Sequence, residues 1–267
     1  MSREDATPKQ VEATRIVLAE IAEILEPYSR AVIVGGTVPY LLVPQEVTPH
    51  EGTVDIDIVL DLNQPGADET LTLHDVLERR LFQQDTKKPF RYTKTVNVDG
   101  ESHTVLIELL AGGTPTSNGL RKISTEDVYV SIIQGIEVAL EHPIQVTLPG
   151  ENDTPVWVAS IPTFFAMKAV ALDRRELRKK SKDAYDIIYC LRNFPGGVGE
   201  IAAKYHEVLP SELVTDGLDL LRSQFESTES IGPTAFARQA DNEDDENLMK
   251  QEAYERVKEL LDILDAD

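Results

Sequence analysis

Two aspartates interrupt an apolar segment in the first quarter of the chain. Asp55 and Asp57 lie within Val54–Leu60 (VDIDIVL), which otherwise has the composition of a buried strand. Side chains alternate along a strand, so both carboxylates are predicted on one face, with Cβ atoms about 7 Å apart. Two unpaired charges in a partly buried strand would be costly, and a shared divalent cation removes that cost. Because all the ligand atoms are oxygens, magnesium or manganese is favoured over zinc.

A third carboxylate has a similar setting. Glu108 interrupts the apolar segment His103–Leu110, which is a predicted strand, and Leu106 and Leu110 share its face. If this strand lies beside Val54–Leu60, three carboxylates converge on one metal site. Each acid taken alone also suits an ordinary solvent-facing strand position, and it is the combination that favours a metal site.

A pair of glycines could bind an anion. Gly35 and Gly36 follow the short apolar strand Ala31–Val34 and precede a predicted helix, Thr37–Val43. Glycine lets the backbone approach a ligand closely, and a helix N-terminus offers free N–H groups to a phosphate. Thr37 could add its hydroxyl. The alternative is a tight turn with no ligand, because the pattern is neither a Walker loop nor a dinucleotide fingerprint.

The elements that must position these residues alternate between helix and strand. A helix is predicted over Thr7–Glu26, another over Leu71–Gln84, and a hairpin turn at Asp99-Gly100. The remaining predicted strands are Arg91–Val98, Gly135–Glu141, Ile144–Leu148 and Val156–Ile161, and helical periodicity continues from Pro162 to the end. The fold class is therefore α/β (α+β), a mixed sheet flanked by helices and followed by a mostly helical C-terminal half. The loop Ala111–Gly119 suggests a division into residues 1–115 and 116–267.

Charge and cysteine content restrict the functional classes. The chain has 267 residues and a formal net charge of −21, which disfavours broad non-specific binding of nucleic acid. Seven of the 26 bases nevertheless lie between Lys168 and Lys182. Cys190 is the only cysteine, which excludes an internal disulfide and suits a reducing, cytoplasmic setting. No apolar run is long enough to predict a membrane span, and no signal peptide is expected.

The C-terminal segment 241–267 carries eleven acids and three bases. Its apolar residues Val257, Leu260, Leu261 and Leu264 recur at helical spacing. The segment is therefore predicted to be a helix that packs by one apolar stripe, keeps its acids in water and is peripheral to catalysis.

The order of these motifs resembles the nucleotidyltransferase (polymerase-beta-like) superfamily: strand, Gly-Gly, helix, Asp-x-Asp on the next strand, and an acid on a later strand. The segments Val156–Leu172 (VWVASIPTFFAMKAVAL) and Lys182–Ile187 (KDAYDI) resemble AbiEii-type toxin nucleotidyltransferases. The likeness covers roughly residues 30–195. It implies magnesium- or manganese-dependent transfer of a nucleoside monophosphate from a nucleoside triphosphate to a hydroxyl of RNA, protein or a small molecule. It also implies a toxin–antitoxin or phage-defence role, with a cognate antitoxin as partner and no membrane.

The resemblance implies roles for individual residues. Asp55, Asp57 and Glu108 would hold the metal ions, and Gly35, Gly36 and Thr37 would seat the outer phosphates. Lys168 would be a fourth catalytic residue, which neutralises charge developing on those phosphates, and it would bind the nucleotide together with Lys182, Asp183 and Asp186.

Lys168 is also unusual on the residues alone. Ala166, Met167, Ala169 and Val170 give it apolar surroundings, where an ammonium needs a partner, and a triphosphate is a good one. Ser181 is expected to cap the next helix, with Asp183 as an acid in its first turn.

Two departures keep other functions open. Members of the family often show Arg-x-Thr-x-Asp-x-Asp, whereas this chain has Glu51 at the arginine position and a longer spacing from the glycines to Asp55. A catalytically degenerate nucleotide- or partner-binding protein on the same fold is one alternative. A small-molecule, antibiotic-type nucleotidyltransferase is another. Phe164, Phe165, Tyr185 and Tyr189 could stack a base, but this spacing is more typical of core, and the histidines show no metal-ligand spacing.

Overall fold

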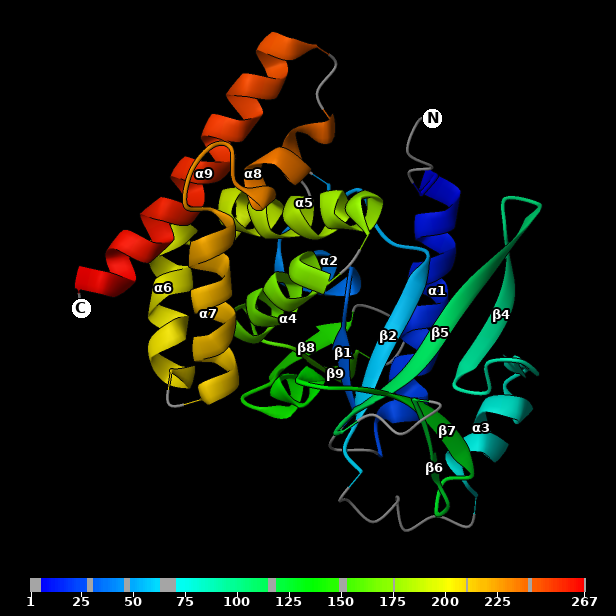
Figure 1. Ribbon diagram of the computed structural model, residues 1–267. Coiled ribbons are helices and arrows are strands. Elements are labelled where there is room, and N and C mark those ends of the chain that lie inside the picture. The colour runs from blue at the N-terminus through cyan, green and yellow to red at the C-terminus, as the bar shows by residue number, and fades with distance from the viewer. Residues whose placement is uncertain are drawn as a thin grey trace. The chain divides into compact units, whose positions relative to one another are not determined.

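A computed structural model describes residues 6–27, 31–45, 49–62, 71–114, 119–148, 153–174, 176–209, 211–239 and 242–266 (Figure 1). The chain forms two compact units. The first comprises Met1–Leu41 and Glu51–Ala159, and the second comprises Leu42–His50 and Ser160–Asp267.

The first unit is built on a mixed sheet that carries both predicted carboxylate strands. Its helices are α1 (Pro8–Leu25), α2 (Thr37–Leu42), α3 (Leu73–Arg79) and the 3₁₀ turn η1 (Ile136–Leu140). Its strands are β1 (Ala31–Val34), β2 (Asp55–Leu60), β3 (Gln83–Gln84), β4 (Arg91–Val98), β5 (Glu101–Gly112), β6 (Leu120–Ile123), β7 (Val128–Ile133), β8 (Ile144–Leu148) and β9 (Thr154–Val158).

The strand order is β3-β4-β5-β2-β1-β9-β8, and β7 joins β5 and β6 off this path. The pairs β2–β5, β1–β9 and β5–β7 are parallel, and the other pairs are antiparallel. This arrangement confirms the predicted mixed sheet, with β2 and β5 as direct neighbours near its middle.

One face of the central strands is apolar and covered. Ile56, Ile58, Val105 and Ile107 are at most 1 % exposed. Helix α1 contacts β4 and β5 and lies alongside the sheet (Figure 1). Helix α1 begins with a capping box at Thr7, and Glu20 on it pairs with Lys94 of β4 at 3.0 Å. Since Lys94 lies opposite Val105 in the β4–β5 ladder, α1 packs on the apolar face. Asp55, Asp57 and Glu108 are thereby left on the opposite face.

Several elements of the first unit differ from prediction. The helix expected over Leu71–Gln84 ends at Arg79, because Leu81 takes a positive φ of 62° and the chain then enters β3. The strand expected at Gly135–Glu141 is the 3₁₀ turn η1, which begins after Gly135 at φ 88°. The hairpin at Asp99-Gly100 is confirmed, with both residues at positive φ.

The units part at residues 159 and 160, and not near residue 115 as the sequence suggests. Residues 115–118 lie outside the described part of the chain, but the strands on either side of them belong together. Strand β7 pairs with β5, and β9 pairs with β1, so hydrogen bonds hold residues 120–158 in the first unit.

The second unit is helical, as predicted for the region after Pro162. Its helices are α4 (Ile161–Arg174), α5 (Leu177–Asn193), α6 (Gly197–Val208), α7 (Glu212–Gln224), α8 (Ile231–Phe236), the 3₁₀ turn η2 (Ala237–Gln239) and α9 (Glu243–Ala266). Helix α9 buries Ala253, Val257, Leu260 and Leu261, which confirms most of the predicted stripe, whereas Leu264 is half-buried. Residues 241 and 267 of the acidic segment lie outside the described chain.

Helix α5 begins earlier than predicted. Its N-cap is Glu176, so Ser181 lies inside the helix and does not cap it. Asp183 therefore stands in the second turn and is not a first-turn acid. In the described residues, no helix is both long enough and apolar enough to cross a membrane.

The close packing of α4 against α7 gives a test of the second unit. A Cβ built on Gly217 would lie 2.5 Å from the Ala166 Cα and even closer to its Cβ. Gly217→Ala should therefore lower stability by about 1–3 kcal/mol through overpacking, measured by urea denaturation.

Gly199→Ala is the matched control, because a Cβ there has nothing within 4 Å. This control should leave stability unchanged or slightly raised, since alanine is the better helix former. Equal effects of the two substitutions would show that α4 and α7 do not pack as described.

Candidate functional site

The three carboxylates of the first unit stand at one level of the sheet. Asp57 of β2 lies directly opposite Glu108 of β5, and Asp55 lies opposite Leu106. Register partners in a sheet share a face, so all three acids are on the same side. All three side chains are half-buried. The Thr53 hydroxyl donates a hydrogen bond to the Asp55 carboxylate and helps to fix its direction.

Glu108 is engaged by a cation from the neighbouring strand. Arg91 of β4 lies opposite Glu108 in the β4–β5 register, and its Nη2 forms an ion pair with Glu108 Oε1. Within the described residues, no group of three or more acidic, histidine or cysteine side chains is close enough together to ligate a metal. The donors thus suit magnesium or manganese in type and share a face, but their present side-chain positions do not converge.

The glycine turn is set by the carboxylate strand beside it. Val34, the last residue of β1, lies opposite Asp57, and Gly35 follows at φ 72°. A Cβ on Gly35 would collide with the Asp57 carboxylate. This position therefore requires glycine both because its φ is positive and because there is no room for a side chain. The Thr37 hydroxyl is buried and donates to the Asp55 carbonyl oxygen at 3.4 Å. The turn therefore brings the backbone of Gly35 against a predicted metal ligand.

Lys168 in the second unit is a buried cation between two buried carboxylates. Its Nζ lies 2.9 Å from Asp183 Oδ1 and 2.6 Å from Asp186 Oδ2. The side chains of Lys168, Asp183 and Asp186 are 8 %, 1 % and 0 % exposed. The sequence predicts that this lysine needs a partner, and α5 supplies two. An ammonium has three donors, and these carboxylates account for two of them.

The cluster shifts the ionisation of its members in opposite directions. Burial alone would lower the pKa of the Lys168 ammonium, but the charges of Asp186 and Asp183 outweigh it and raise that pKa. Burial alone would raise the pKa of the Asp186 carboxyl, but the Lys168 charge and the His50 hydrogen bond hold it well below its usual range. Lys182, half-buried on α5, also contributes to lowering the pKa of Asp186. Lys168 and Asp186 therefore both carry charge at neutral pH.

His50 is a member of this cluster that the sequence did not reveal. Its Nε2 lies 3.0 Å from Asp186 Oδ1, and its side chain is fully buried. The residue stands in a polar loop without periodicity, and its partner is 136 positions away, so no local signal identifies it. Its ring contacts Tyr185 and Tyr189 at centroid distances of 5.3 and 4.7 Å.

The aromatic residues near this cluster belong mainly to the core. Phe164 and Phe165 are at most 1 % exposed, and Tyr189 is buried and accepts a hydrogen bond from Gln45. Tyr185 is half-buried and remains the best placed of the four to meet a ligand.

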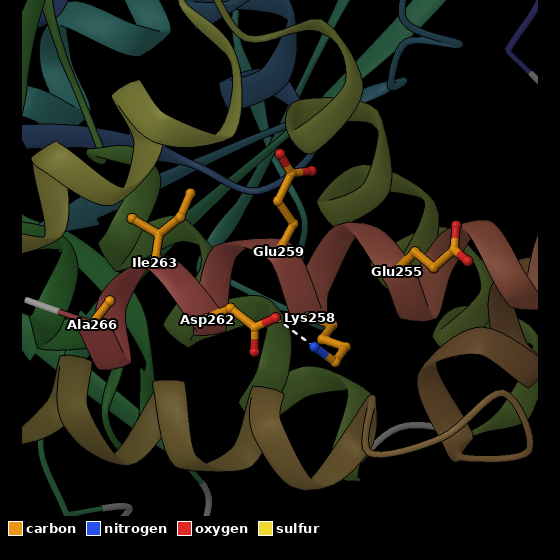
Figure 2. Close-up of a pocket in the computed structure, with 6 residues that line it drawn as sticks. All are labelled: Glu255, Lys258, Glu259, Asp262, Ile263 and Ala266. Atoms are coloured by element: carbon orange, nitrogen blue, oxygen red, sulfur yellow. Dashed lines mark hydrogen bonds and ion pairs between the residues drawn. The ribbon is translucent and has the colours of Figure 1, made fainter.

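A hollow of about 530 Å³ on α9 is lined by none of the predicted site residues. Figure 2 shows its lining, in which Lys258 pairs with Asp262. The lining residues are Glu255, Lys258, Glu259, Asp262, Ile263 and Ala266. The hollow is formed by the exposed side of one acidic helix, so we assign it no catalytic role.

A family profile matches residues 34–265 of the chain and therefore spans both units. It is described as "Nucleotidyl transferase AbiEii toxin, Type IV TA system". The chain belongs to this family. It is accordingly a nucleotidyltransferase of the toxin type found in type IV toxin–antitoxin systems, which confirms the resemblance read from the sequence.

One solved structure is similar in outline to this AbiEii-family chain: "Crystal structure of JHP933 from Helicobacter pylori". The two are 15 % identical, 97 % of each chain is covered, and the TM-score is 0.43. No curated protein matches the chain.

The buried ion cluster makes a strong prediction about stability. Lys168→Met should lower the free energy of unfolding by about 3–5 kcal/mol, because it leaves Asp183 and Asp186 buried without their cation. Urea denaturation at neutral pH measures this loss. The control is Lys204→Met, which removes an exposed pair with Glu200 and should cost at most about 1 kcal/mol. A loss for Lys168→Met no greater than that of the control would contradict the cluster.

The lowered pKa of Asp186 predicts how its contribution depends on pH. A depressed folded pKa stabilises the protein above the unfolded value of about 3.9 and loses that effect as the pH falls toward the folded pKa. Wild type should thus exceed Asp186→Asn in stability by a constant margin at pH 5–7, and the margin should narrow below about pH 4. Urea midpoints of both proteins from pH 7 to pH 3 test this, and a margin independent of pH would refute it.

Proposed function

We propose that this nucleotidyltransferase moves a nucleoside monophosphate from a nucleoside triphosphate to a hydroxyl acceptor, using divalent cations held by Asp55, Asp57 and Glu108. The observation that carries the proposal is the register of β2 and β5. It aligns Asp57 with Glu108 on one face, two residues from Asp55, while the other face of the same strands is a closed apolar core.

The donor set fits magnesium or manganese. All the donors are carboxylate oxygens, and β2 and β5 are adjacent strands, so a change of side-chain rotamer is enough to bring Glu108 toward Asp57. When bound, divalent cations offset the charge that develops on the attacking and leaving oxygens of an in-line displacement.

The chain's own residues would then bind and orient the reactants. The acceptor oxygen forms a bond to the α-phosphorus, the bond from that phosphorus to the bridging oxygen breaks, and pyrophosphate leaves. Glu108 is the residue we propose to help activate the acceptor hydroxyl by accepting its proton. Asp55 and Asp57 would hold the cations that offset the negative charge of the triphosphate.

Other residues would meet the outer phosphates. Gly35, Gly36 and Thr37 seat them along the backbone of the glycine turn. Lys168 offers its remaining donor, and its charge stays in place because Asp183 and Asp186 keep it ionised. Lys182 would add a second positive charge at the nucleotide.

The acceptor is an RNA end, a protein or a small molecule, and the chemistry of transfer is the same for each. The net charge of −21 disfavours a large docking area for RNA, but a local site is compatible with it. Membership of a toxin family makes a cognate antitoxin the partner we propose for control of the activity.

The deciding experiment is incubation of the protein with each labelled nucleoside triphosphate, magnesium or manganese, and total RNA, total protein or an aminoglycoside. Wild type should label one acceptor class with one preferred nucleotide. Asp57→Asn should reduce labelling by roughly 100-fold or more, because it keeps the side-chain shape and removes a metal ligand's charge.

Asp99→Asn is the matched control, because Asp99 stands at the hairpin turn at φ 49°, a conformation that asparagine also tolerates. The control should retain full activity. If Asp57→Asn labels as well as wild type, Asp57 is not a metal ligand. If wild type labels nothing and no triphosphate raises its melting temperature, the degenerate-fold alternative replaces this proposal.

A further inference from the structure

A row of charged residues crosses three strands at one level of the sheet. Arg91 of β4 lies opposite Glu108 of β5, which lies opposite Asp57 of β2. Glu108 is therefore flanked by a cation on one side and a carboxylate on the other, and both neighbours share its face. In the structure it is paired with Arg91, which draws its carboxylate toward β4 and away from β2.

The segment before β4 holds Arg91 in place. Asp85 Oδ1 accepts hydrogen bonds from the N–H groups of Lys87 and Lys88 at 2.7 and 3.0 Å. The Arg91 N–H donates to the Lys88 carbonyl at 2.8 Å, and the Arg91 carbonyl accepts from the Asp85 N–H at 2.9 Å. The guanidinium lies 5.3 Å from the Phe90 ring centroid. This loop presents the arginine to Glu108 as a fixed part of the fold.

The pairing of Arg91 with Glu108 is one that a stronger cation can replace. The two side chains are 28 % and 19 % exposed, so water and ions reach them. Nη2 of the arginine forms the ion pair, and Arg91 Nε is buried without a hydrogen-bond partner among the described residues. The pairing therefore lacks the two-pronged contact through Nε and Nη2, which would be tighter.

The pairing of Arg91 with Glu108 partly offsets the negative charge of the three carboxylates. Asp55, Asp57 and Glu108 share one face, and without a cation their repulsion would disfavour the assembled site. Arg91 supplies one positive charge to the metal-free protein. Neighbouring strands are about 5 Å apart, so Glu108 can turn from Arg91 to Asp57 by a change of rotamer without any movement of the backbone.

We infer that Arg91 is the built-in counter-ion of the metal-free site: it holds Glu108 on the β4 side until a divalent cation at Asp55 and Asp57 takes the carboxylate over. The inference rests on the proposed function, in which Glu108 is a metal ligand. Arg91 is a positioning residue in this scheme, and it competes with the metal for one carboxylate.

Manganese binding without nucleotide tests the competition, because free Mn²⁺ can be measured by electron paramagnetic resonance. Arg91→Met should tighten Mn²⁺ binding by roughly threefold to tenfold, the scale of a partly exposed ion pair, and should lower the melting temperature of the metal-free protein. Arg91→Lys keeps the charge and should fall between wild type and Arg91→Met. Arg121→Met, an exposed arginine of β6, is the control and should bind Mn²⁺ like wild type.

Steady-state kinetics add a second readout. With Arg91→Met the metal concentration for half-maximal rate should fall, while kcat at saturating metal changes less. A purely structural role would lower kcat and leave the metal requirement unchanged.

Glu108→Gln distinguishes a failure of the Arg91 competition from a failure of the proposed metal site. If it weakens Mn²⁺ binding and Arg91→Met fails to tighten it, Arg91 is not a competitor and only this inference falls. If Glu108→Gln binds Mn²⁺ as wild type does, Glu108 is not a ligand, and the proposed metal set falls together with the inference. If Arg91→Met tightens binding in wild type but not in the Glu108→Gln background, the competition for Glu108 is established.

Discussion

The parallel pairing of β2 with β5 is the constraint on which the rest of the first unit depends. Side chains alternate with a period of two, so one register decision assigns every residue of both strands to a face. In the observed register Ile56 and Ile58 of β2 lie opposite Ile107 and Leu109 on the buried apolar face, and Asp57 lies opposite Glu108 on the other face. A slip of one residue would place Glu108 in the apolar core, which would be costly for an ionised carboxylate. Fold stability and site assembly are thus enforced by the same hydrogen-bond ladder.

The second unit solves a different electrostatic problem. Lys168 is surrounded by apolar side chains, and burying its charge is tolerable only because α5 brings Asp183 and Asp186 against it. His50 occupies the other oxygen of Asp186 and comes from Leu42–His50, which belongs to the second unit although the chain on either side of it belongs to the first. Only four residues separate His50 from Asp55 along the chain.

In both units a small number of basic side chains offset the charge of neighbouring carboxylates. The chain has 47 acids and 26 bases, so most carboxylates must remain in water or share a base. At the two sites described here each base lies beside a particular carboxylate. Arg91 stands in register with Glu108, and Lys168 stands between two aspartates.

The sequence by itself determined many of the local elements and the types of residue that could do chemistry. Apolar alternation predicted β2 and β5, Asp99-Gly100 predicted the hairpin between β4 and β5, and helical periodicity predicted the second unit, because each of these signals is short-range. The Asp-x-Asp spacing also placed Asp55 and Asp57 on one face, since that follows from strand geometry alone. Lys168 was recognised as needing a partner for the same kind of local reason.

Only the tertiary structure decided which residues meet. Arg91 and Glu108 are joined by strand register, and His50 and Asp186 by packing across 136 positions, and neither pairing leaves a mark in the local pattern. The loop near residue 115 looked like a boundary because of its composition, but hydrogen bonds from β7 and β9 keep the following strands in the first sheet. Composition and periodicity describe what a segment prefers by itself, whereas register and burial depend on every neighbour at once. The partners of the charged residues are therefore fixed by the folded chain and not by its sequence motifs.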